Sequence, residues 1–280
     1  MNQEAARGPS RWPLLVILAA MLVVTFSFFR MTWFGVRLSD EALAEKIGSD
    51  KPRDVQHALE EMSMRMQGDK DAARPFYDEV CALEEHPETP VRNMVAWVMG
   101  MDNGEPRFRD ALVRLLEDDA VTVRYNAACS LTTFGDERAR PILLEMLEPH
   151  RVLAPVSGTV EDVLGHGIAV KLGVQLARIA PAEGDRVEVR CPLEGTIHRV
   201  LTGSGGRLEK GDEILSIAPL DVQILEALKG LYLVGRAEDL PLVEAFERGA
   251  AGRDPLLQTQ ARSTAEAIRG RAAQAAPKSQ

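Results

Sequence analysis

The side chains that could support catalysis or metal binding are few. Two histidines, His166 and His198, lie in one glycine-rich region, and imidazole is a common ligand of zinc. No His-x-His or Leu-x-x-His-x-Gly motif accompanies them, so we expect them to be solvent-exposed residues of turns and strands. Three cysteines, Cys81, Cys129 and Cys191, are widely spaced, which excludes a Cys-x-x-Cys metal motif and a disulfide framework. We expect them to be small buried hydrophobic residues.

A glycine-rich loop is the other feature that could bind a ligand. The stretch Gly203–Gly206 reads Gly-Ser-Gly-Gly, but a phosphate-binding loop should lead into a helix, and this one leads into the strand-like pattern RLEKGDEILSI. We therefore predict a hairpin turn. The sequence has no HExxH, Walker or Gly-x-Ser-x-Gly motif. It predicts no catalytic residue, no metal site and no cofactor, and hence a protein that is not an enzyme.

Composition describes the class of protein in which these residues lie. The chain has 280 residues, 45% of them hydrophobic and 27% charged, so it can bury a core and is long enough for about two domains. Its net charge of −9 argues against a nucleic-acid-binding protein, which would normally present a basic face.

An apolar segment near the N-terminus predicts a membrane anchor. Trp12–Phe29 spans 18 residues without a charge, close to the roughly 20 apolar residues that cross a bilayer. The apolar character continues over Met31–Val36, and Trp12 and Trp33 stand near the two ends, where interfacial tryptophans are enriched. A cleaved signal peptide is the alternative, but phenylalanines occupy the place of a small-x-small cleavage site. We predict an uncleaved transmembrane helix over residues 12–36, preceded by a tail over residues 1–11.

The orientation of this anchor does not follow from the basic residues. Arg7 and Arg11 precede the segment, whereas Arg30, Arg37 and Lys46 follow it, so the count of Lys and Arg does not decide. We expect a single-pass protein of the bacterial inner membrane with a cytoplasmic N-terminus and most of the chain in the periplasm.

A helical repeat follows the anchor. The pairs Val91-Arg92 and Val123-Arg124 lie 32 residues apart. After each pair, apolar residues continue at helical spacing to a glycine and a polar turn, and a second amphipathic helix follows, as in ALVRLLE and PILLEML. A looser unit begins near Val55, and a helix over Asp40–Ile47 could be half of an earlier one. One helix pair cannot bury its apolar face alone, so such units are expected to stack.

This pattern resembles HEAT repeats in their short bacterial form, and VR--AA--L--FGD over Val123–Asp136 is its most specific part. The resemblance implies an α-solenoid over residues 38–150. It also implies a surface for a protein partner, although repeats that only support another domain remain the alternative.

A second, different repeat follows, of the form Val-x-x-Pro-x-x-Gly-Thr. Its halves align at an offset of 37 residues and later at 38, so one residue is inserted in the glycine-rich turn near Thr202. Alternating apolar and polar residues between glycines predict short strands in two similar halves of an all-β domain. The aligned residues are Pro155 with Pro192, Gly158 with Gly195, and Gly173 with Gly211.

The doubled motif resembles the biotinyl/lipoyl family over about residues 152–219. Carrier members of that family attach a cofactor to a lysine in the hairpin between the halves, but here that hairpin, Ile179–Val189, has no lysine, and the domain's lysines are Lys171 and Lys210. We therefore predict a lysine-less domain of the membrane-fusion-protein type, an interaction module. Efflux adaptors of that type usually carry a coiled-coil hairpin between the halves, and only a tight turn is expected here. Barrel-type phosphotransferases and peptidoglycan peptidases would need paired histidines at specific positions. The domain has only His166 and His198, without the accompanying motifs, so neither class is favoured.

Helical patterning returns after this domain and resembles a further HEAT-like unit over residues 220–272, before a tail predicted to be disordered over residues 273–280. We expect a small all-β barrel sandwich, residues 151–219, inserted into one α-solenoid, giving a multidomain α plus β protein. The hypothesis that follows is a membrane-anchored, non-enzymatic scaffold that binds protein partners such as subunits of a membrane complex, with membrane lipid contacted through the N-terminal helix. A periplasmic adaptor of a transport system is the alternative, and a cofactor carrier or barrel-type enzyme is the third hypothesis.

Overall fold

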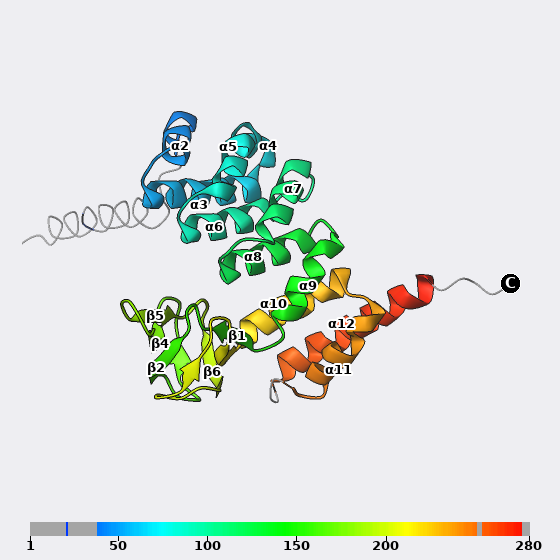
Figure 1. The fold of residues 1–280 in the computed structure, drawn as a ribbon. Helices are drawn as coiled ribbons and strands as arrows, with labels where there is room; N and C mark the ends of the chain where they lie inside the picture. Colours follow the sequence, from blue (N-terminus) through cyan, green and yellow to red (C-terminus); the bar gives the residue numbers. More distant parts are fainter. Residues whose placement is uncertain (1–20, 22–37, 251–253, 276–280) are drawn as a thin grey trace, which may run out of the picture.

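The computed structural model describes Met21, residues 38–250 and residues 254–275 as a helical array interrupted by a β domain (Figure 1). The predicted anchor over residues 12–36, apart from Met21, lies outside the described residues. Among the described residues, no helix is both long and apolar enough to cross a membrane.

Helices of two groups form the array. Before the β domain the chain forms α2 (Asp40–Ile47), α3 (Pro52–Gly68), α4 (Lys70–Ala73), α5 (Tyr77–Ala82), α6 (Thr89–Met99), α7 (Pro106–Leu115), α8 (Val121–Thr132) and α9 (Arg140–Glu145). After it come α10 (Asp221–Val234), α11 (Leu240–Glu247) and α12 (Pro255–Ala275). The helix predicted over Asp40–Ile47 is present as α2. Helix α12 runs past residue 272, where the sequence predicted the helical unit to end.

A glycine and a proline set the turn inside each helix pair. The glycine lies at the end of the first helix or just beyond it, where its flexible backbone favours a turn. The proline occupies the first turn of the second helix, where its missing N–H costs nothing. The spacing of six positions recurs at Gly100 and Pro106, Gly135 and Pro141, and Gly235 and Pro241.

The array is continuous across the β domain. Helix α10 packs against both α8 and α9, although some 75 residues separate α9 from it in the sequence. Gly230 makes the approach close, because a Cβ at this position would lie 2.8 Å from the Leu143 side chain and 3.1 Å from that of Thr132. The prediction that the β domain is inserted into one helical array is therefore confirmed.

The β insertion, His150–Ala218, contains two antiparallel four-stranded sheets that form a sandwich. Its strand orders are β1-β8-β6-β3 and β5-β4-β2-β7. The strands are β1 (His150–Leu153), β2 (Gly158–Val163), β3 (Ala169–Val170), β4 (Gln175–Ala180), β5 (Val187–Arg190), β6 (Gly195–Val200), β7 (Arg207–Leu208) and β8 (Glu213–Ala218). The two sheet orders correspond strand by strand between the halves: β1 with β5, β8 with β4, β6 with β2, and β3 with β7. The two halves predicted from the doubled motif are thus equivalent in topology.

The equivalence extends to register. Thr159 on β2 pairs with Ala180 on β4, and Thr196 on β6 pairs with Ala218 on β8. Each pair of strands has a register shift at the same place, before Asp162 in the first half and before Arg199 in the second. Such bulges bend a strand and increase its twist, which allows the short sheets to curve around a small core.

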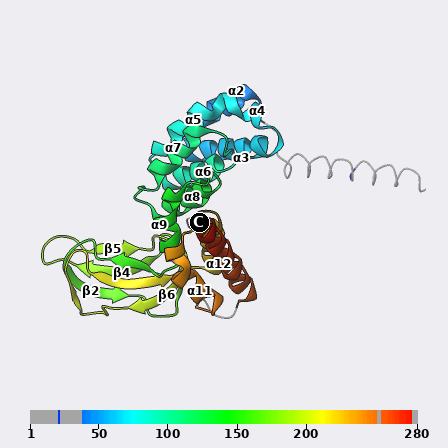
Figure 2. The ribbon, with the colours of Figure 1, turned by 90° about the vertical axis from the view of Figure 1, so that its right-hand side faces the viewer.

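The insertion lies beside the array on a defined side. Figure 1 shows the sandwich below α3, α6 and α8, and Figure 2 shows it across α9 from α11 and α12. It leaves and re-enters the array through neighbouring strands, because β1 pairs with β8, with His150 opposite Ile217.

Candidate partner-binding groove

The residues that define the helical repeat are used inside the array. Val91 and Val123 are fully buried. Arg92 donates from Nε and Nη2 to the carboxylate of Asp118, at 2.6 and 3.0 Å, which joins its own repeat to the next one. Arg92 and Arg124 each also donate to carbonyl oxygens of the turn before their helix; for Arg124 these include the oxygen of Asp118, at 2.8 Å. These arginines position the turns rather than a partner.

Asp118 is the acidic centre of this joint. Burial alone would raise its pKa, but hydrogen bonds from Arg92 and from the backbone N–H of Ala120 outweigh burial and hold the pKa of the Asp118 carboxyl below its usual range. The carboxylate therefore stays charged over the neutral pH range and keeps two repeats in register.

The glycines of the doubled motif are structural too. A Cβ on Gly158 would lie 2.4 Å from the carbonyl oxygen of Ala180, and one on Gly195 would lie 2.4 Å from that of Ala218. Gly173 and Gly211 have φ angles of +80° and +95°, which other residues rarely adopt. The two prolines differ: Pro155 is exposed, whereas Pro192 is half-buried and faces α6 and α8.

The potentially reactive side chains are dispersed. His166 and His198 are exposed, as predicted, and Nδ1 of His166 lies 2.7 Å from the carbonyl oxygen of His198. Among the described residues, no three His, Cys, Asp or Glu side chains are grouped so that they could hold a metal. Lys171 and Lys210 are both exposed and lie outside the turn between β4 and β5.

The cysteine prediction is only partly correct. Cys191 is buried, but Cys81 and Cys129 are half-buried, because each lies on a helix face only partly covered by neighbouring helices. Burial raises the pKa of the Cys129 thiol to about 12, so this side chain stays protonated at neutral pH.

A cavity of about 530 Å³ lies between the array and the insertion. The helical wall is formed by the first turns of α6 and α8, including Pro90 and Thr122. The opposite wall is formed by Leu172 and Pro192 of the insertion. Leu172 is 55% exposed, so a large apolar side chain faces open space here.

A second cavity, of about 270 Å³, continues along the helices. Both cavities are lined by Asn93 and Thr122, and the second reaches Val222 and Glu226 on α10. We call the two together the repeat groove, which runs from the insertion across α6 and α8 to α10. Val222 is 59% exposed, which adds another uncovered apolar side chain.

Two asparagines face each other in the repeat groove. The Asn126 Nδ2 group on α8 donates to Asn93 Oδ1 at 2.9 Å and to the Asn93 carbonyl oxygen at 3.3 Å. Trp97, one helical turn beyond Asn93 on α6, is 44% exposed. The sequence analysis did not identify this pair. Their 33-residue separation, one more than the repeat spacing, is a weak signal that could have pointed to it.

Comparison with known proteins supports the helical part. The family described as HEAT repeats matches residues 80–154. A comparison with curated proteins gives no match.

Three solved structures show partial likeness to the chain. One is the complex of CpcE and CpcF of phycocyanin lyase from Nostoc sp. PCC7120, at a TM-score of 0.47 and 16% identity, covering 84% of this chain and 67% of that chain. An engineered protein aligns at a TM-score of 0.43 and 14% identity, covering 82% of this chain and 80% of that chain. A single-chain, multi-domain long-chain acyl-CoA carboxylase aligns at a TM-score of 0.25 and 21% identity, covering 36% of this chain and 11% of that chain. The family match shows HEAT repeats in the chain over residues 80–154, and the sheet topology and helix packing show a β-sandwich inserted into the helical array.

Proposed function

We propose that the protein is a membrane-anchored, non-enzymatic scaffold that holds a protein partner in the repeat groove. The observation that carries the proposal is the groove itself. The repeat-defining valines and arginines are used within the array, whereas Leu172 and Val222 are exposed residues that line two adjoining cavities. Trp97 is also exposed, one helical turn beyond Asn93. Exposed aromatic and apolar side chains around a recess are typical of protein interfaces.

In this proposal the insertion is a lysine-less lipoyl-like domain of the membrane-fusion type, acting as an interaction module. Its two equivalent halves support that assignment. The turn between β4 and β5, residues 181–186, contains no lysine to carry a cofactor. The same short turn disfavours an adaptor that reaches through a coiled-coil hairpin between the halves. The N-terminal segment would hold the scaffold at the bacterial inner membrane, with the described residues in the periplasm.

Site-specific photo-cross-linking in cells tests the proposal. A photoreactive phenylalanine analogue replaces Val222 in the groove, Arg199 on the sandwich, or, as a control, exposed Arg109 on α7. We expect one discrete cross-linked protein from position 222 and none from position 109. Cross-links from position 199 alone would move the docking surface to the insertion. No cross-link from any position would contradict the scaffold. The intact mass of the detergent-extracted protein should show no biotinyl or lipoyl increment on Lys171 or Lys210.

A further inference from the structure

We propose that the repeat groove binds an extended, apolar peptide segment, one residue of which is held by its backbone N–H and C=O at Asn93 and Asn126. This inference rests on the proposed function, because it specifies the chemistry of the partner that the groove holds. It follows from a count of hydrogen-bonding groups, from the backbone form that this count selects, and from the charge of the walls.

The hydrogen-bond count leaves one donor group and one acceptor open. Asn126 uses Nδ2 to reach both oxygens of Asn93. Its own Oδ1 meets no donor within the described part of the chain, and the Nδ2 group of Asn93 meets no acceptor there. Both side chains line the groove. An amide oxygen beside an amide NH₂ group is the hydrogen-bonding complement of the backbone N–H and C=O of one extended residue, which point to the same side of the chain.

An open amide pair of this kind selects an extended chain. The backbone groups of an α-helix are bonded within the helix except at its ends. A bound helix would therefore offer no backbone hydrogen-bond partner to the open groups of the two asparagines. An extended segment presents its N–H and C=O groups outward and directs successive side chains to opposite sides. Those side chains would meet Leu172 and Pro192 at one end of the groove and Val222 at the other.

The charges of the walls determine which peptides fit. Of the lining residues, Asp119 and Glu226 are acidic, Arg124 is basic, and His150 lies 3.7 Å from the carboxylate of Glu145. Arg124 is already occupied with carbonyl oxygens of the preceding turn. Both basic side chains of the described lining, Arg124 and His150, thus already have partners within the chain, which disfavours an acidic peptide. It fits an uncharged apolar segment, and a basic residue beside that segment would be complementary to Asp119 or Glu226.

The test uses the full chain, extracted in detergent, as the target for a phage-displayed library of random peptides. The strongest selected sequence is then synthesised with a fluorophore, and its affinity is measured by anisotropy. We expect apolar peptides without acidic residues. Methylation of one backbone nitrogen near the middle of the peptide should weaken binding by roughly tenfold or more, as expected for one lost hydrogen bond.

Asn93→Asp is the decisive variant, since it replaces the open NH₂ donor by a carboxylate oxygen of the same shape, although it also adds one negative charge. The carboxylate still accepts the hydrogen bond from Asn126, so thermal unfolding should be unaffected while the peptide binds roughly tenfold more weakly. Asn103→Ala is the matched control, because Asn103 lies outside the groove and bonds to the Thr133 carbonyl oxygen. Its peptide affinity should equal that of the wild type.

Three results would overturn the peptide inference: no enriched peptide, equal affinity for wild type and Asn93→Asp, or tolerance of N-methylation at every position. The N-methyl series decides even if Asn93→Asp fails to fold. A protein cross-linked from position 222 in the absence of any selected peptide would leave the scaffold proposal standing and reject the extended peptide alone. Absence of both would reject both.

Discussion

Arg92 shows what a single side chain contributes to this array. Its guanidinium group donates to the Asp118 carboxylate and to the carbonyl oxygens of His86 and Pro87. A lysine could not reproduce this, because its ammonium group is compact and lacks the planar fork that meets both carboxylate oxygens. Charge and geometry are therefore both required at this position.

Replacing Asp118 by Asn should make the free energy of unfolding less dependent on pH in the acidic range. The folded-state pKa of Asp118 lies below its unfolded value of about 3.9, so its contribution is fully present above about pH 4 and is lost as pH falls through the folded value. At pH 7 we expect a loss of about 2 kcal/mol for Asp118→Asn, as for a hydrogen bond to a charged group. The difference from wild type should shrink below pH 4. Urea unfolding from pH 2.5 to 7 measures this, with exposed Asp71→Asn as the control. A difference independent of pH would contradict it.

Gly158→Ala and Gly195→Ala should destabilise the sandwich to a similar degree. In each case the new Cβ would lie 2.4 Å from a backbone oxygen, which cannot move without disturbing a strand pair, so we expect a cost of about 1–3 kcal/mol. Gly165→Ala is the matched control, since nothing lies within 4 Å of its Cβ position. Chemical denaturation compares the three. Equal stability of Gly158→Ala and Gly165→Ala would contradict the close-approach account.

Whether the sequence predicts the role of an individual residue depends on whether that residue belongs to a repeated pattern. Gly158 and Gly195 are predictable because each half of the sandwich brings a backbone carbonyl oxygen close to the same position. Glycine is therefore required at equivalent places in both halves, and the repeated pattern reveals it. Asn93 and Asn126 are not, because a half-exposed polar residue in a helix looks like any solvated one. Their relation depends on how two helices pack.

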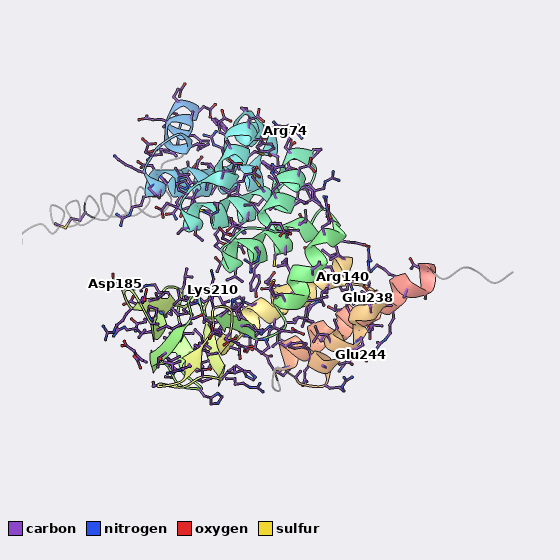
Figure 3. All side chains as sticks on the ribbon, viewed as in Figure 1. Arg74, Arg140, Asp185, Lys210, Glu238 and Glu244 are labelled. Carbon is purple, nitrogen blue, oxygen red and sulfur yellow. The ribbon has the colours of Figure 1, made fainter. Side chains whose placement is uncertain are left out.

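At the scale of elements, ion pairs join the helix pairs on either side of the insertion. Arg140 on α9 donates to the buried carboxylate of Asp239, just before α11, with both contacts at 2.7 Å, and also contacts Glu238. Figure 3 shows Arg140 and Glu238 side by side where these elements meet. Arg236 pairs with Glu137 across the same joint. Sequence patterns do not predict such contacts, because 99 residues separate Arg140 from Asp239.

Arg140→Ala should weaken this joint strongly. Asp239 is only 3% exposed, and removing its partner leaves a buried charge uncompensated, which typically costs about 3–5 kcal/mol. Lys229→Ala is the control, because its pair with Glu226 is about half exposed and such pairs contribute less than about 1 kcal/mol. Thermal and urea unfolding measure both. Comparable losses in the two variants would show that the joint does not depend on Arg140.

At the scale of the whole molecule, the insertion leaves the helical array intact. Its first and last strands are hydrogen-bonded neighbours, so paired residues such as His150 and Ile217 lie only about 5 Å apart. The sequence predicted the insertion from the return of helical patterning. It could not predict that the sandwich would face α6 and α8, because this depends on how parts distant in the chain are placed, such as Leu172 and Pro90, which line the same cavity.

Replacing residues 150–219 with a short Gly-Ser linker should leave a folded helical protein. Helix α10 can still pack on α8 and α9 through Gly230, since the linker spans only the gap between adjacent strands. Circular dichroism should show helical content and one cooperative unfolding transition. Loss of cooperativity would mean that the sandwich is needed to hold α9 against α10. Peptide binding to the shortened protein should weaken, because the Leu172 wall is gone.

The walls of the repeat groove come from two different parts of the molecule, and this has a thermodynamic consequence. One wall rises from the helices and the other from the sandwich, so any tilt between these two bodies changes the width of the space between them. A molecule that grips the outer face of the sandwich and favours one tilt must alter the peptide affinity, and the peptide must alter that molecule's affinity by the same factor. Binding at the outer face of the sandwich would then change the peptide affinity of the repeat groove, so the two binding events would be coupled.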